Sequence, residues 1–225
     1  MVGFIVNTGA VLTGSALGLI TGGKLKDKYK SIILTSLGLV TVLIGIKMAV
    51  KTESVLIVVG SLVFGGLIGQ WLQIEEKLAK LGDYLKKRTG SSSSDFVLGF
   101  VTASLLFCVG PMTIVGSFED GLYNSSELIF IKSLMDGFAA MALSAALGAG
   151  VLFSAIVVFV YQGALTLTAR YFQTFLSEMV INEMSATGGV IMLGIAINLL
   201  GLAKIKVGNL LPALILAVLI TWLIN

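Results

Sequence analysis

Long, uninterrupted apolar stretches alternate with short polar segments along most of this chain. Crossing ~30 Å of hydrocarbon at ~1.5 Å per residue requires a helix of about 20 largely apolar residues. The apolar residues run continuously rather than at every second position, a pattern that favours helices and excludes a β-barrel. We therefore predict an all-α, polytopic transmembrane helix bundle with about eight spans. The predicted spans are residues 2–22, 31–50, 54–72, 95–113, 127–147, 149–169, 185–202 and 206–224.

The composition supports a membrane protein without a separate soluble domain. Of the 225 residues, 56% are hydrophobic and 12% are charged, and the mean hydropathy is +1.02. Cys108 is the only cysteine and there is no histidine, which excludes an intramolecular disulfide, a Cys/His metal site and histidine acid–base chemistry. With no serine–base pair or aspartate dyad either, we expect no enzymatic activity, no metal and no cofactor.

Lysine and arginine residues predict the orientation of the chain. Eleven of the fifteen lie in three connections that fall on the same side of an eight-span bundle. By the positive-inside rule this side is cytoplasmic, so we predict a bacterial inner-membrane protein with both termini outside. The net charge of +3 then reflects topology rather than an acidic partner, and we expect the lipid bilayer, not nucleic acid, as the environment. These basic residues are Lys24, Lys26, Lys28, Lys30, Lys77, Lys80, Lys86, Lys87, Arg88, Lys204 and Lys206. The first segment lacks the basic start and cleavage site of a secretory signal, so we expect it to remain as a span.

Residues 74–88 form an amphipathic segment between the third and fourth predicted spans. Its leucines recur at helical spacing, which predicts a helix on the inner membrane surface with its lysines towards anionic headgroups. A partner-binding helix is the alternative. The serine run 91–94 then predicts a linker between a three-span half, 1–90, and a five-span half, 95–225.

The two halves carry similar segments. Gly3-Phe4-Ile5-Val6 with Gly14 parallels Gly99-Phe100-Val101-Thr102 with Gly110, and spans two and three parallel spans seven and eight. Opposite orientation of these pairs indicates an inverted repeat, with spans five and six as an inserted hairpin. Glycine-rich apolar segments also resemble one another without such a repeat, and both interpretations stay open.

Small residues at every fourth position predict close helix packing. Gly14, Gly18 and Gly22 share one face of the first span, and Gly65 and Gly69 share one face of the third. Such faces let two helix backbones approach within a membrane. They suit sliding surfaces, a static bundle or a homodimer.

Asp136 is the most conspicuous polar residue, because it lies about ten residues into a span and hence ~15 Å deep. A charge at this depth costs at least ~2.5–3.5 kcal/mol and needs a partner, a proton or water. Lys132 lies one turn before it, and Lys47 in the second span is the alternative cation. Both a structural ion pair and a substrate- or proton-binding carboxylate fit this pattern.

Amide side chains at intramembrane positions provide further candidate site residues. Asn7, Gln162, Asn198 and Asn209 come from four different spans. Because amides both donate and accept hydrogen bonds, they suit a neutral or zwitterionic small molecule or a partly dehydrated cation. Hydrogen bonding between helices is the alternative role. Gly110-Pro111 interrupts the fourth span, so the following stretch, Met112–Asn124, forms a re-entrant or partly unwound segment, or else an ordinary outer loop.

Several motifs resemble a bacterial membrane-protein family catalogued as a domain of unknown function, number 554, the YqgA-like proteins. The resemblance extends over nearly the whole chain and implies a multi-pass inner-membrane protein often described as a transporter, without assigning a role to any residue. The matching motifs are GFIVNTGAVLTGSALG, LGLVTVLIGIKMAV, GGLIGQWLQIEEKL, GFVTASLLFCVGPMTIVGSFEDGL, KSLMDGFAA, LGAGVLFSAIVVFVYQGALTL and INLLGLAKIKVGNLLPAL.

The leading hypothesis from the sequence is a small secondary transporter or permease for an unidentified solute or ion. Asp136 would couple transport to a proton or cation, and the four amides would orient the substrate. With no ATP-binding loop in the sequence, transport would run on ion or solute gradients or with a separate subunit. The alternative is a non-transporting scaffold or sensor that docks partners through helix 74–88.

Overall fold

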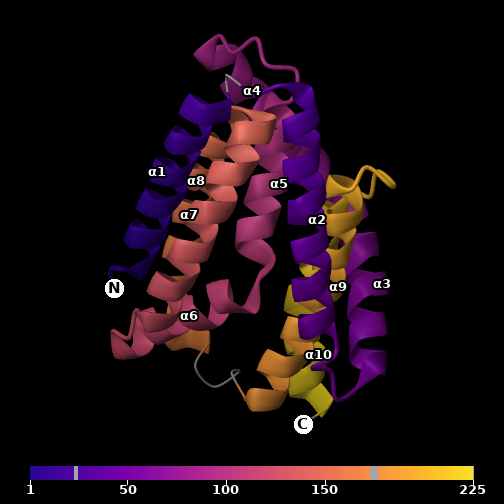
Figure 1. The fold of residues 1–225 in the computed structure, drawn as a ribbon. Coiled ribbons are helices and arrows are strands. Elements are labelled where there is room, and N and C mark those ends of the chain that lie inside the picture. Colours follow the sequence, from indigo (N-terminus) through magenta and orange to yellow (C-terminus); the bar gives the residue numbers. More distant parts are fainter. Residues whose placement is uncertain (23–24, 173–176, 225) are drawn as a thin grey trace.

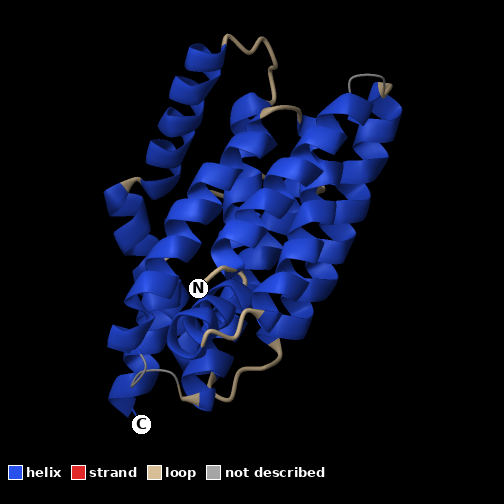
Figure 2. Ribbon diagram, turned by 90° about the vertical axis from the view of Figure 1, so that its left-hand side faces the viewer, coloured by secondary structure: helices blue, strands red, loops and turns tan. Residues whose placement is uncertain are grey.

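The computed structural model describes residues 1–22, 25–172 and 177–224. Within these ranges the chain is helical and contains no strand, which confirms the predicted all-α class (Figure 2). The helices are α1 Gly3–Gly22, α2 Asp27–Ala49, α3 Val55–Leu72, α4 Ile74–Thr89, α5 Phe96–Val109, α6 Pro111–Tyr123, α7 Glu127–Leu147, α8 Gly150–Phe172, α9 Glu178–Leu199, the 3-10 helix η2 Val207–Leu210 and α10 Pro212–Ile224.

Seven described segments are each long and apolar enough to cross a membrane, with η2 and α10 counted as one. The eighth is the pair α5 and α6, which is bent by 59° at Gly110-Pro111. The structure therefore has seven or eight spans, as the hydropathy pattern predicted. The segment after Pro111 is helical up to Tyr123, so it is neither unwound nor an irregular outer loop, while the re-entrant course stays a prediction. Proline at the first position of α6 explains this break, since it starts a helix well but cannot continue one.

Two helices begin earlier than the hydropathy pattern predicted. α2 begins at Asp27 rather than residue 31, and α9 begins at Glu178 rather than residue 185. The added turns are polar, so a hydropathy criterion excludes them. In α9 the helix starts with Ser177, whose hydroxyl accepts the Val180 N–H and so supplies a cap.

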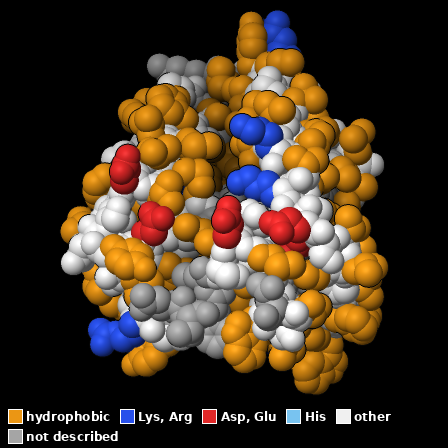
Figure 3. Space-filling model, turned by 90° about the horizontal axis from the view of Figure 1, so that it is seen from below, with side chains coloured by type: hydrophobic (Ala, Val, Ile, Leu, Met, Phe, Trp, Pro, Cys, Tyr) orange, Lys and Arg blue, Asp and Glu red, His pale blue; other side chains and the backbone are white. Residues whose placement is uncertain are grey.

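Both termini lie at one end of the bundle, and α4 lies across the opposite end (Figure 1). The basic connections gather at the α4 end. Lys206 Nζ lies 2.6 Å from Glu76 Oε1 of α4, and Lys30 lines a cavity with the linker that follows α4. Lys24 lies outside the described residues. Seen from the end with the termini, the surface carries both acidic and basic side chains among apolar ones (Figure 3). The basic connections at the α4 end agree with the predicted clustering of basic residues, while the side of the membrane that each end faces stays a prediction.

The helices of the N-terminal part pack against helices of the C-terminal part. α1 packs chiefly on α7, α2 on α9, and α3 on α10. A Cβ added at Gly14 or Gly18 would come closer than 3.0 Å to the carbonyl oxygen of Gly137 or Met141, and one at Gly69 would meet the Asn209 carbonyl. The small-residue faces of α1 and α3 are thus occupied within the chain. The proposed inverted repeat stays a prediction.

Candidate functional site

Four of the seven predicted site residues meet in one buried cluster between α1, α7 and α8. Asn7, Lys132, Asp136 and Gln162 are each at most 8% exposed, and we call them the central polar cluster. Lys132 Nζ forms an ion pair with the Asp136 carboxylate one helical turn away. The Asn7 Nδ2 group donates to Asp136 Oδ2 at 2.9 Å and to Gln162 Oε1 at 3.1 Å. Asn7 therefore links the ion pair on α7 to the amide on α8.

Glycine packing brings these three helices together. Gly14 lies two turns after Asn7 on the same face of α1 and contacts the backbone of Gly137, the residue that follows Asp136. Gly163 follows Gln162 and leaves room for the Phe4 ring, since a Cβ there would lie 3.3 Å from it. The glycines that let α1, α7 and α8 approach one another thus lie next to the polar residues of the central polar cluster.

Two amide atoms of the cluster lack a hydrogen-bond partner among the described residues. They are the Asn7 carbonyl oxygen Oδ1 and the Gln162 nitrogen Nε2, and both are buried. Rotating either amide by 180° would worsen the contacts, because Asn7 would turn an oxygen towards the Asp136 carboxylate and Gln162 would turn a donor towards Asn7 Nδ2. The cluster therefore offers one free acceptor and one free donor beside a buried ion pair.

The broken span lies directly beside this cluster. The Lys132 ammonium is 6.0 Å from the centre of the Phe107 ring, near the end of α5. Thr113 at the start of α6 donates its hydroxyl to the Phe107 carbonyl oxygen at 2.8 Å. Gly110, between the two helices, has an extended backbone at φ −68° and ψ 142°. Helix ends beside a buried polar site are typical of the discontinuous spans that bind substrate in transporters.

The other three predicted site residues lie elsewhere. Asn198 holds the connection after α9, as its side chain donates to the Ile205 carbonyl and accepts the Ile205 N–H, both at 2.8 Å. Asn209 accepts the Glu75 N–H and donates to Gln70 Oε1, both at 2.9 Å. Lys47 is exposed and forms no ion pair with any described residue. The two asparagines thus join helices and loops at the α4 end.

Two buried carboxylates were not predicted as site residues. The Glu183 carboxylate accepts the Thr52 hydroxyl and the Glu53 N–H, both at 2.7 Å, and the Ser54 N–H at 2.9 Å. Asp120 accepts the Gly3 N–H at 3.1 Å. Both carboxylates thus bind N–H groups at the start of a helix, α3 for Glu183 and α1 for Asp120, where a negative charge is favourable. No local pattern points to them, because the N–H groups that they bind lie more than one hundred residues away in the chain.

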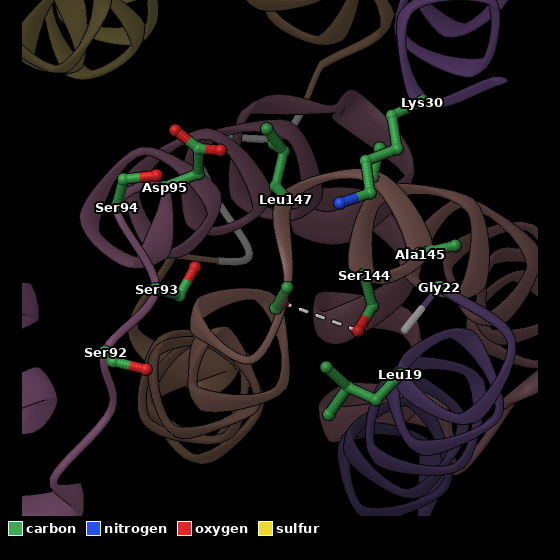
Figure 4. Close-up of a pocket in the computed structure, with 12 residues that line it drawn as sticks. Leu19, Gly22, Lys30, Ser92, Ser93, Ser94, Asp95, Ser144, Ala145 and Leu147 are labelled. Carbon is green, nitrogen blue, oxygen red and sulfur yellow. Dashed lines mark hydrogen bonds between the residues drawn. The ribbon is translucent and has the colours of Figure 1, made fainter. Parts of the chain in front are cut away.

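A polar cavity of about 400 Å³ lies at the α4 end of the α1–α7 interface. Figure 4 shows the Lys30 side chain reaching into it from α2, across from Ser93 of the linker and Asp95 at the start of α5. At the inner side of the cavity the Ser144 hydroxyl donates to the Ser15 carbonyl oxygen at 2.9 Å. The lining residues are Leu19, Gly22, Lys30, Ser92, Ser93, Ser94, Asp95, Ser144, Ala145, Ala146, Leu147 and Gly148.

One helix interface connects this cavity to the central polar cluster. Ser144, Ala140 and Asp136 follow one another at one-turn spacing on α7, and Val11 lies one turn after Asn7 on α1. Val11 and Ala140 are fully buried, so they separate the cavity from the cluster in this conformation. Among the described residues, no group of three His, Cys, Asp or Glu residues lies close enough to hold a metal ion.

These features define a polytopic α-helical membrane protein with a buried polar centre beside a broken span. The chain belongs to the family described as "Protein of unknown function (DUF554)", which it matches over residues 2–222. This membership confirms the resemblance noted in the motifs.

Two relatives match along nearly their whole length. The chain is 30% identical over 229 residues to the "Uncharacterized membrane protein YdfK" of Bacillus subtilis (strain 168), covering 100% of this chain and 97% of YdfK. It is 27% identical over 224 residues to the "Uncharacterized protein YqgA" of Escherichia coli (strain K12), covering 96% of this chain and 94% of YqgA. No solved structure matches the chain.

Proposed function

We propose that this protein is a small secondary transporter or permease of the bacterial inner membrane. The observation that carries the proposal is the pair of unpartnered amide atoms, Asn7 Oδ1 and Gln162 Nε2, beside the buried Lys132–Asp136 ion pair. A buried polar group without a partner costs about 1–3 kcal/mol. A small molecule that both donates and accepts hydrogen bonds would remove this cost at both atoms.

Asp136 is the group that couples binding to a proton or cation. When Asp136 takes up a proton or a cation, its attraction for Lys132 weakens, and the Lys132 ammonium becomes available to a substrate. When the proton leaves, the ion pair re-forms and displaces the substrate. The proposal is supported by the end of α5, just before the bend at Gly110-Pro111, which lies beside the Lys132 ammonium.

The α1–α7 interface is the route from the α4 end. The 400 Å³ cavity is its vestibule, and Val11 and Ala140 form the closed segment between the vestibule and the cluster. Glycines along α1 favour a small displacement of α1 against α7, because backbone surfaces without side chains can shift without repacking large groups.

Cysteine accessibility tests this route. In a Cys108→Ser background we would introduce Asn7→Cys, Ser15→Cys or Ser61→Cys and add a membrane-impermeant maleimide to either side of sealed, oriented vesicles. Ser15 and Ser61 are a matched pair, since both are fully buried serines without a hydroxyl partner, but Ser61 lies on α3 outside the route. We expect labelling at positions 7 and 15 and none at 61. Folded variants that resist labelling at 7 and 15 from both sides would rule out the route.

A non-transporting scaffold is the second candidate, and the ion pair itself favours it. Lys132 and Asp136 neutralise each other within one helix, as a purely structural pair would. In that case an apolar double replacement, Lys132→Met with Asp136→Leu, keeps the fold and its thermal stability, because buried ion pairs are often replaceable by apolar residues of similar volume. The scaffold candidate also predicts no labelling at positions 7 and 15.

A further inference from the structure

A large apolar groove lies on the other side of the broken span from the central polar cluster. Its volume is about 940 Å³, near the upper end of the roughly 300–1,000 Å³ typical of ligand pockets. Its lining residues come from seven helices: α3, α4, α5, α6, α8, α10 and, through Met184, α9. A groove of this volume is large enough to hold part of a bound molecule.

The lining shows what kind of molecule fills the groove. Nearly all lining side chains are apolar, and its rim is formed by exposed hydrophobic residues of α3, α4 and α10, among them Ile68, Leu81 and Ile215. The outer faces of α3 and α10 meet lipid in a membrane-spanning bundle. The groove is therefore open to the hydrocarbon of the bilayer rather than to water.

Two polar groups stand out in this lining. Ser104 on α5 is 1% exposed, and its hydroxyl has no hydrogen-bond partner among the described residues. Lys77 on α4 is exposed at the rim and is the one charged residue among those that line the groove. α4 carries further basic residues in its last turn, Lys86, Lys87 and Arg88. The groove is thus apolar inside and has one cationic side chain, Lys77, at its rim.

We infer that this groove binds an anionic phospholipid of the bilayer, with an acyl chain along its apolar floor and the headgroup at Lys77. A neutral lipid satisfies the apolar lining but leaves Lys77 without a counter-charge. A water-soluble anion satisfies Lys77 but leaves the apolar floor empty. The anionic lipid satisfies both, and the floor residues Cys108 and Tyr161 place its chain next to Gln162 of the central polar cluster. The proposed lipid site is separate from the proposed transport route, so the two proposals can be tested independently.

Lipid binding to the purified full-length protein tests this assignment. Detergent-solubilised, delipidated protein would be titrated with phosphatidylglycerol or phosphatidylcholine of identical acyl chains, and bound lipids would be counted by native mass spectrometry. Lys77→Gln is compared with Lys80→Gln, which removes the same charge from an exposed position on the same helix but outside the groove. Both substitutions are at the surface and should leave the fold intact.

We expect one phosphatidylglycerol per chain, bound about fivefold more tightly than phosphatidylcholine, as one lysine beside an anionic headgroup provides. Lys77→Gln should abolish this preference and Lys80→Gln should keep it. Ser104→Met, which fills the floor, should weaken binding of both lipids. The assignment fails if neither lipid is retained, or if Lys80→Gln lowers the preference as much as Lys77→Gln. It also fails if a Cys108→Ser, Ile215→Cys variant forms disulfide-linked dimers in place of lipid binding, because the occupant is then a second copy.

Discussion

Asp136 shows how a charged side chain can be stabilised deep within a membrane-spanning helix. Its carboxylate has a cation one turn away and an amide donor from another helix, so its charge is both neutralised and hydrogen-bonded. The Lys-before-Asp order is the weaker one for an intrahelical pair in water. Burial makes the pair matter more than it does in water, since each charge has lost its water and depends on the other for neutralisation.

The first prediction tests whether the buried charges of Lys132 and Asp136 depend on each other. Asp136→Asn leaves Lys132 as a buried, unpaired cation, and we expect it to lower the free energy of unfolding by about 3–5 kcal/mol. The double variant Lys132→Met, Asp136→Asn removes both charges and should recover most of this loss. Thermal unfolding of the detergent-solubilised variants can be followed by the loss of helical circular dichroism. A double variant that is as unstable as Asp136→Asn would show that the two charges are not coupled.

Sequence reasoning identified the central polar cluster better than the other buried polar groups. Asn7, Lys132, Asp136 and Gln162 stood out because each interrupts a continuous apolar run. Glu183 and Asp120 did not, since both lie at the ends of spans, where polar residues are ordinary. Asn198 and Asn209 interrupt apolar runs too, but their side chains bind the backbone of Ile205 and Glu75. Composition alone cannot distinguish an amide that holds a loop from one that faces another helix.

At the scale of elements, the contact between α1 and α7 is the most extensive between the described helices. It depends on glycines, because a residue without a side chain lets the two helix backbones approach closely. A Cβ at Gly14 would collide with the Gly137 backbone, whereas a Cβ at Gly9, on another face of α1, would meet nothing within 4 Å. These two glycines form a natural matched pair for substitution.

The second prediction therefore compares Gly14→Ala with Gly9→Ala. Gly14→Ala should separate α1 from α7 and destabilise the protein by about 1–3 kcal/mol, the usual cost of overpacking. Gly9→Ala should be neutral or stabilising, because alanine favours helix. Unfolding temperatures in the same detergent provide the comparison. Equal effects of the two substitutions would contradict close packing at Gly14.

α4 is held to the rest of the bundle by polar contacts at its first turn. Glu75 accepts the Gly208 N–H at 2.7 Å, and Glu76 pairs with Lys206. The Lys206 hydrogen bond lowers the pKa of Glu76 below its usual 4.5, and the same contact raises the pKa of Lys206 above 10.5. Burial raises the pKa of Glu75, in spite of the Gly208 N–H that it accepts.

The third prediction follows from the direction of these shifts. The lowered pKa of Glu76 means that its contribution is present above pH 4.5 and is lost as the pH falls through the folded-state pKa. The raised pKa of Lys206 means that its contribution is present below pH 10.5 and is lost as the pH rises through its folded-state pKa. Between these limits α4 should be more protected from hydrogen exchange in the natural chain than in Glu76→Gln.

Protection factors of residues 74–89, normalised to the intrinsic exchange rate at each pH, measure this difference. Protonation of Glu75 at low pH has the opposite effect and favours docking of α4, since it removes a charge that is partly buried in the docked helix. Because the Glu76 charge also raises the pKa of Glu75, Glu75→Gln and the double variant Glu75→Gln, Glu76→Gln provide the comparison that isolates the pair of Glu76 and Lys206. A difference that persists well below pH 4.5 would show that Glu76 acts without its charge.

The order of these elements was largely predictable, whereas their exact limits were not. Continuous apolar runs located the spans, and Pro111 located the bend, because each effect is local in the sequence. The first turns of α9 were missed because their stability comes from Glu183 contacting residues 52–54 of another connection. Tertiary contacts of this kind leave no periodic signal in the segment itself.

At the scale of the whole molecule, the two ends of the bundle differ in chemistry. The end with α4 gathers the basic connections, whereas the opposite end carries both termini and a mixture of acidic and basic side chains (Figures 1 and 3). The membrane potential and the anionic lipids of the inner leaflet both favour basic connections on the cytoplasmic side. The basic end is therefore predicted to face the cytoplasm, and the orientation determines from which side the 400 Å³ cavity is reached.

The fourth prediction tests this orientation with two exposed serines, Ser92 in the linker after α4 and Ser125 between α6 and α7. In a Cys108→Ser background, each is replaced by cysteine and intact cells are treated with a membrane-impermeant maleimide. We expect Ser125→Cys to react and Ser92→Cys to react only after the membrane is permeabilised. The two positions serve as controls for each other, because both are exposed and only the side of the membrane differs. The reverse pattern would place the basic end outside, and the cavity beside Lys30 would then collect solutes from the cell exterior rather than from the cytoplasm.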